Sequence, residues 1–249
     1  MSLDIDITFN FTTDCSYWES YNKGRSDTDP DIHSPRLRLY QKELYSRKTP
    51  CGIDFKLDFG KNKAYDYLVW NGIRFGSDNI INMCERYNLS WSRETEIYDY
   101  DAKIKEYILK SYTLGGEILF PKHVKSINTE RGRNHNIKDR FDLTLECIRH
   151  FYNGQSSPLY DVLKTDEEFF KLFGNGQEGF KGYVDFFFLN DLVSSDYSKV
   201  KLFLGAEQDV FNRNPLPQNK KEWEQLLKAQ IDFLVGRNNR IKKFIDNQS

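Results

Sequence analysis

The stretch RGRNHNIKDRFDLTLECIRHFY, residues 131–152, gives the strongest structural signal in this chain. Its first ten residues crowd cationic, amide and acidic side chains together, and a helical periodicity of apolar residues then follows. At about 100° per residue, the apolar side chains of residues 137–152 fall on one side of a helix. The stretch therefore predicts a helix over residues 137–152 that buries one face and is preceded by a charged loop.

Two acids lie on the opposite face of this predicted helix. Asp142 and Glu146 are four residues apart, a spacing that brings helical side chains together. Such carboxylates can hold a cation or act as general acid and base. They can equally form a solvated face, with Arg149 as the partner of Glu146. Leu143 beside them indicates a face that is not wholly exposed, so both acids are candidate catalytic residues.

The charged loop suggests an anion site at the start of the predicted helix. A helix N-terminus presents free backbone N–H groups and a partial positive charge, and guanidinium groups match phosphate oxygens. The candidate anion-binding residues are Arg131, Arg133, Asn134 and Arg140. In the alternative interpretation, Arg131 and Arg133 pair with surface acids while Asn136 and Asp139 cap the helix.

Asp185 is the third candidate catalytic residue. It lies within GYVDFFFLNDLV, residues 182–193, a segment that is apolar nearly all round and therefore predicts a buried helix. A buried carboxylate needs a partner or must be protonated. The candidate partners are Arg140, Arg149, Arg237 and Arg240. A structural ion pair and a ligand-binding role both fit this pattern.

The remaining sequence predicts an α+β fold. Period-two alternation predicts strands at residues 4–12 and 53–59. Further strands are expected at 67–77, 117–121 and 199–205, with Asn71–Gly72 as a tight turn. Helices are expected after Ser34, after Ser77 or Asp78, over 101–112, within 158–173, and after Asn219. We therefore expect residues 1–249 to form a single domain. In it, a small mixed or antiparallel sheet from the N-terminal half packs against a mainly helical C-terminal half.

Composition excludes several classes of protein. The 249 residues are 15% aromatic and 29% charged, as in a globular protein with a solvated surface, and the net charge of −1 argues against general nucleic-acid binding. The four cysteines form no CxxC pair, so neither a zinc site nor a redox dithiol is indicated. No signal peptide or apolar run of membrane-spanning length is present, which predicts a cytoplasmic protein without a membrane partner.

Motif searches identify no cofactor. The chain has no P-loop, GxGxxG, GxSxG or HExxH, and its four histidines lack ligand spacing, so no metal is assigned. An ADP-ribosyltransferase site would need an arginine on an early strand, a serine-bearing strand and a glutamate. Arg36 or Arg38, Ser77 and Glu117 occur in that order, but each is a single common residue and the arginines fall in a predicted helix.

Several segments resemble a known protein family. They are residues 29–52 (DPDIHSPRLRLYQKELYSRKTPCG), 113–121 (TLGGEILFP), 131–152 and 182–193. They are similar to a bacterial family of hypothetical proteins that contain a domain of unknown function. The resemblance covers most of the chain and supports a single domain, but it implies no catalytic residue and no substrate.

Two functions follow as expectations. The first is an intracellular protein that binds or processes a phosphate-bearing small molecule such as a nucleotide, through the arginines and acids of residues 131–146. The second is a non-catalytic protein-interaction module. An arginine-lined cavity would favour the first, and a large exposed apolar patch would favour the second. Whether the protein is an enzyme is left open by the sequence.

Overall fold

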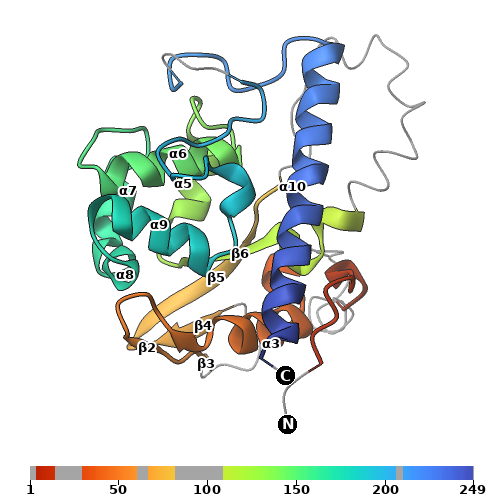
Figure 1. Cartoon of the computed structure of the whole chain (residues 1–249), viewed down its shortest axis with the longest axis vertical. Coiled ribbons are helices and arrows are strands. Elements are labelled where there is room, and N and C mark those ends of the chain that lie inside the picture. Colours follow the sequence, from red (N-terminus) through yellow and green to blue (C-terminus); the bar gives the residue numbers. More distant parts are fainter. Residues whose placement is uncertain (1–3, 15–29, 61–66, 82–108, 206–209, 249) are drawn as a thin grey trace.

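The computed structural model describes residues 4–14, 30–60, 67–81, 109–205 and 210–248, and it confirms the predicted α+β architecture (Figure 1). The strands lie in the N-terminal half, and the second half is mainly helical. Figure 1 shows the helices of residues 127–186 grouped on one side, with the long C-terminal helix running beside them. Among the described residues, no helix has the length and apolar character needed to cross a membrane.

The main sheet has four antiparallel strands in the order β3-β4-β5-β6. Their bounds are Asp58–Phe59 (β3), Leu68–Trp70 (β4), Ile73–Asn79 (β5) and Glu117–Pro121 (β6). A separate pair joins β1 (Arg47–Lys48) to β2 (Asp54–Phe55). Asn71 and Gly72 link β4 to β5 with φ values of 45° and 80°. Positive φ at both central residues is what a two-residue hairpin turn requires, so the predicted turn is confirmed.

The strand predicted over residues 4–12 does not form. The side chain of Asp6 accepts a hydrogen bond from the Thr8 amide at 2.8 Å, and that of Asn10 accepts one from the Thr12 amide at 2.9 Å. These local side-chain bonds compete with strand pairing. The segment contains only the short 3-10 helix η1 (Phe11–Asp14), although Phe11 is fully buried.

Distant contacts alter two other predicted strands. The predicted strand over 53–59 divides into β2 and β3, because the Leu57 amide donates to the Ser46 side chain at 3.0 Å. Residues 199–205 contain only one isolated bridge, between Val200 and Val193. The amide of Phe203 donates instead to a side chain of the helical half.

One predicted helix start is wrong, and one predicted helix is only partly described. Ser77 and Asp78 belong to β5 and do not begin a helix. The rest of that predicted helix, residues 82–87, and most of the one over 101–112 lie outside the described residues.

The helices begin largely where capping residues predicted them. Ser34 accepts a hydrogen bond from the Leu37 amide at 3.1 Å, and Asn219 accepts one from the Glu222 amide at 3.0 Å. The bounds in the first half are Pro30–His33 (α2), Pro35–Tyr45 (α3) and Leu114–Gly116 (η5). Those in the second half are Ile127–Arg133 (α5), Phe141–Tyr152 (α6), Tyr160–Thr165 (α7), Glu167–Phe170 (α8), Lys171–Phe173 (η6), Gly176–Phe186 (α9), Asn190–Leu192 (η7) and Lys220–Asp246 (α10).

Helix α6 is shorter than the sequence predicted. It begins at Phe141 and not at residue 137, because Lys138 and Asp139 adopt φ values of 47° and 65° that no α-helix can contain. The preceding arginines lie on the separate helix α5. The charged run is therefore a helix and a turn, and not a loop that leads into α6.

An aromatic core joins the sheet to the helices. Phe55 of β2 and Phe75 of β5 each contact Phe169 of α8, and Phe169 contacts Phe173 and Phe187 in turn. All five rings are buried. Edge and tilted contacts of this kind add to the stabilisation that burial provides. This core holds the helical half in place, including α6, whose outer face carries the candidate site.

Candidate functional site

Asp142 links helix α6 to two segments that lie over it. Its carboxylate accepts hydrogen bonds from Arg140 Nε at 3.1 Å, from Arg140 Nη2 at 2.5 Å and from the Phe203 amide at 2.8 Å. Arg140 Nη1 donates to the Pro215 carbonyl at 2.8 Å. Asp142 is fully buried. The acid therefore positions Arg140 and the chain around Phe203, and it does not face bulk water.

Glu146, one turn further along α6, is held by two cationic neighbours. Arg149 donates to it from Nε at 2.8 Å and from Nη2 at 2.7 Å, and His150 Nε2 lies 3.3 Å from its Oε1. Burial alone would raise the pKa of Glu146, but these hydrogen bonds hold it below the ordinary value of 4.5. The carboxylate is ionised at neutral pH, and the predicted pairing with Arg149 is confirmed.

A hollow with two adjoining chambers lies over the outer face of α6, and we call it the α6 hollow. The leucine chamber encloses about 190 Å³ and the lysine chamber about 450 Å³. Both chambers are lined by Leu202, Gly205 and Val210, so they share a wall. The leucine chamber is also lined by Leu143, Leu204, Pro215, Leu216 and the polar Arg140, Arg213, Asn214, Gln218 and Glu222. The lysine chamber is also lined by Glu146, Arg149, Ser198, Lys199, Val200 and Lys201.

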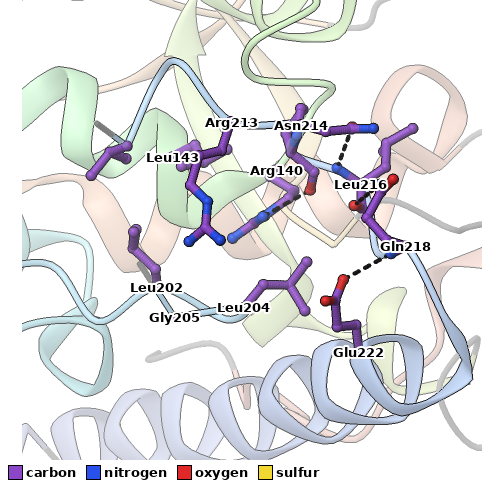
Figure 2. Close-up of a pocket in the computed structure, with 12 residues that line it drawn as sticks. Arg140, Leu143, Leu202, Leu204, Gly205, Arg213, Asn214, Leu216, Gln218 and Glu222 are labelled. Atoms are coloured by element: carbon purple, nitrogen blue, oxygen red, sulfur yellow. Dashed lines mark hydrogen bonds between the residues drawn. The ribbon is translucent and has the colours of Figure 1, made fainter. Parts of the chain in front are cut away.

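Among the described residues that line the α6 hollow, cationic side chains outnumber acidic ones. Those that line it are Arg140, Arg149, Lys199, Lys201 and Arg213, against Glu146 and Glu222. Lys199, Lys201 and Arg213 are exposed and form no salt bridge with another described residue. Figure 2 shows the guanidinium groups of Arg140 and Arg213 directed toward the leucine chamber. The hollow can therefore attract an anion with charges that the acids of its described lining do not neutralise.

The four predicted anion-binding residues do not converge. Arg131 is fully buried, with Nη1 2.5 Å from Asp78 and Nε 3.3 Å from Asp139. The Arg133 side chain is 72% exposed. Asn134 follows the last residue of α5, and its side chain donates to the Pro158 carbonyl at 3.3 Å. Of the predicted group, Arg140 alone lines the α6 hollow, together with the predicted acid Glu146.

Asp185 is not a buried acid with an arginine partner, so that prediction is wrong. Its side chain is exposed and accepts hydrogen bonds from Asn190 at 2.5 Å and from the Tyr197 hydroxyl at 2.7 Å. Helix α9 ends at Phe186, and Phe188 turns the chain with a φ of 59°. Residues 182–193 therefore contain the end of helix α9 followed by a turn. Asp185 lies on the exposed side of this helix end.

A buried polar network connects Ser77 and Glu117, two of the residues considered for an ADP-ribosyltransferase site. Gln41 Nε2 donates to Ser77 Oγ at 2.7 Å, and Ser77 Oγ donates to Glu117 Oε2 at 3.0 Å. Arg36 and Arg38 lie on helix α3 and not on an early strand, so they do not complete that arrangement. Among the described residues, no three His, Cys, Asp or Glu side chains are grouped as ligands of a metal ion.

Sequence reasoning missed three of the cationic residues of the hollow. Lys199 and Lys201 fall in KVKLFLG, residues 199–205, where the predicted strand does not form. Side chains two residues apart share one side of an extended chain. The spacing therefore contained the signal that both lysines face the same way. Arg213 lies in RNPLPQ, residues 213–218, and no local pattern there indicated its role.

His150 makes the stability of this region depend on pH. Its hydrogen bond to Glu146 raises its pKa above 6.5; burial opposes the shift and the Ser156 carbonyl supports it. The protonated form therefore stabilises the fold below pH 6.5, and this contribution is lost as pH rises through the raised pKa. We expect His150→Gln to lower the unfolding temperature by about 1–3 °C at acidic pH, because such pairs contribute little. The difference from wild type should narrow with increasing pH in thermal unfolding followed by circular dichroism.

His135 provides the control for this measurement. Its side chain is exposed and has no carboxylate partner among the described residues. We expect His135→Gln to differ from wild type by the same small amount at every pH. A constant difference for His150→Gln as well would contradict the assigned role of the Glu146 hydrogen bond.

Comparison with known proteins gives a family for the chain but no function. A family model described as "Family of unknown function (DUF6994)" matches residues 5–241. No curated protein and no solved structure matches the chain.

Proposed function

The chain belongs to this family of unknown function, and we propose that it binds a phosphate-bearing small molecule, such as a nucleotide, in the α6 hollow. One observation carries the proposal. Lys199, Lys201 and Arg213 line the hollow without a salt bridge to any described residue, beside Arg140 and Arg149. Unneutralised ammonium and guanidinium groups in a concave site favour phosphate oxygens.

The size of the hollow supports a small molecule as the ligand. The lysine chamber alone, at about 450 Å³, falls within the range of roughly 300–1,000 Å³ that is typical of small-molecule sites. The other expected function, a protein-interaction module, gains no support from the exposed apolar side chains. Among the described residues, the large ones come from five separate segments: Ile53, Phe59, Leu109, Val124 and Val235.

Neutralising both lysines should weaken the binding of a phosphate ligand. We expect inorganic tripolyphosphate to bind the wild-type protein at low ionic strength, in isothermal titration calorimetry. Lys199→Gln/Lys201→Gln should lower the affinity at least about tenfold, because a hydrogen bond to a charged group contributes about 1.5–3 kcal/mol. Added salt should weaken binding to the wild type, because these lysines are exposed.

The matched control removes the same charge elsewhere. Lys48 of β1 and Lys243 of α10 are exposed and line neither chamber, and Lys243 lies at the opposite end of α10 from Glu222. Lys48→Gln/Lys243→Gln should bind tripolyphosphate as the wild type does. An equal loss of affinity in both double variants would show that net charge and not the hollow attracts the anion. That result, or a wild-type protein that binds neither tripolyphosphate nor a nucleoside triphosphate, would contradict the proposal.

A further inference from the structure

We infer that the ligand of the α6 hollow is a nucleoside polyphosphate, with its base in the leucine chamber and its phosphates in the lysine chamber. The inference rests on the proposed function and adds the chemical class and the orientation of the ligand. The two chambers share the wall formed by Leu202, Gly205 and Val210. We take the two chambers to be neighbours that one molecule with two chemically different ends spans.

The leucine chamber has the chemistry of a site for a planar aromatic ring. Half of its lining is apolar: Leu143, Leu202, Leu204, Val210, Pro215 and Leu216. Arg140 and Arg213 present planar guanidinium groups, which stack on aromatic rings (Figure 2). Glu222 and the amides of Asn214 and Gln218 supply acceptors and donors at the same wall. Apolar surfaces with a few polar groups bind and orient a base.

The balance of charge fixes the orientation. In the leucine chamber, Arg140 is neutralised by its paired hydrogen bonds to Asp142, and the described lining carries one further charge of each sign, on Arg213 and on Glu222. Among the described residues that line the lysine chamber, Arg149 pairs with the one carboxylate, that of Glu146, and Lys199 and Lys201 form no salt bridge.

The excess positive charge thus lies in the larger, lysine chamber. Because Arg149 is paired with Glu146, Lys199 and Lys201 are the cations left for a ligand, and a chain of phosphates can contact both lysines. Ser198 adds a hydroxyl donor to the same wall. The lysine chamber therefore favours a polyphosphate end, and the leucine chamber favours an uncharged ring.

Calorimetric titration with tripolyphosphate, adenosine and the common ribonucleoside triphosphates tests this inference. At least one triphosphate should bind about tenfold or more tighter than tripolyphosphate, because burial of the base adds apolar contact. Leu204→Ala/Leu216→Ala should reduce that advantage and leave tripolyphosphate affinity unchanged. Both leucines are half-buried, so the loss of core packing is small. Lys199→Gln/Lys201→Gln should weaken tripolyphosphate and the triphosphates by the same factor.

A measurement on the wild type avoids dependence on the leucine variants folding. Nuclear Overhauser contacts from the protons of the base to leucine methyl groups should appear in the triphosphate complex. If tripolyphosphate binds as tightly as every triphosphate, or if those contacts are missing, the inference is overturned while the proposed anion site stands. If neither tripolyphosphate nor any triphosphate binds, the proposed function itself fails.

Discussion

Replacing Arg237 with methionine is expected to lower the free energy of unfolding by about 3–5 kcal/mol, because removal of a buried charged donor leaves its partners unsatisfied. Arg237 lies in the middle of α10 with no exposed surface. It donates to the carbonyl groups of Phe187, Gly115 and Glu117 at 3.1, 2.7 and 2.9 Å and to the Tyr45 hydroxyl at 3.0 Å. These acceptors belong to three different parts of the chain, so one side chain joins α10 to both halves of the fold.

Urea unfolding measures this effect, and Arg240 is the matched control. Arg240 follows on the same helix and pairs with Asp191 at 2.8 and 2.7 Å, but its side chain is 44% exposed. Solvent screens such a pair, so Arg240→Met should cost no more than about 1 kcal/mol. Similar losses for the two variants would show that Arg237 contributes as a surface ion pair does, against the role assigned to it here.

The second large effect is expected at Arg131. Arg131→Met should lower the free energy of unfolding by about 3–5 kcal/mol at neutral pH, because it leaves Asp78 and Asp139 without their buried partner. Burial already raises the pKa of Asp78 well above 3.8, although Arg131 opposes that shift. A carboxyl whose folded pKa is raised destabilises the fold when it ionises, and this cost disappears as pH falls. The loss should therefore shrink under mildly acidic conditions, as urea unfolding at several pH values would show.

Arg133 is the control for Arg131, because its replacement shows what the loss of an exposed arginine from α5 does to stability. Its side chain is 72% exposed, and its nearest described acid, Glu130, is 3.9 Å away. We expect Arg133→Met to change stability by less than about 0.5 kcal/mol at every pH. A pH-independent loss at Arg131 would exclude the ionised Asp78 as the source of the cost.

Local signals predicted the elements whose determinants lie within the element itself. Ser34 caps the helix that begins at Pro35, and Asn219 caps α10. Asn71 and Gly72 adopt the positive φ values that their hairpin needs. In each case a side chain or a backbone preference acts on its nearest neighbours, which a sequence displays directly.

Elements determined by distant partners could not be predicted in this way. The carbonyl of Asp139 accepts from Arg131 Nη2 at 2.6 Å, and the turn that makes this bond delays α6 until Phe141. The Phe203 amide donates to Asp142, which leaves it unavailable for a strand. Neither partner is adjacent in the sequence, and periodicity carries no information about such bonds.

The candidate site could be predicted only in part, because distant contacts bring some of its residues together. The sequence identified a concentration of charge at residues 131–146 and two members of the hollow, Arg140 and Glu146. It placed Arg131 and Arg133 in one loop, whereas on helix α5 they lie about 200° apart, one inside and one outside. The lysines at 199 and 201 reach the hollow through the tertiary fold, which no local pattern encodes.

The shared carboxylate of Asp142 limits how this region can be redesigned. Asp142 orients Arg140 and also accepts a hydrogen bond from the amide of Phe203, which lies between the lining residues Leu202 and Leu204. A substitution of Asp142 would therefore disturb two parts of the lining together. Leu204 and Leu216 are half-buried, and their side chains do not join two segments by hydrogen bonds as Asp142 does. An engineer who wishes to change the ligand preference should vary those leucines and leave Asp142 unchanged.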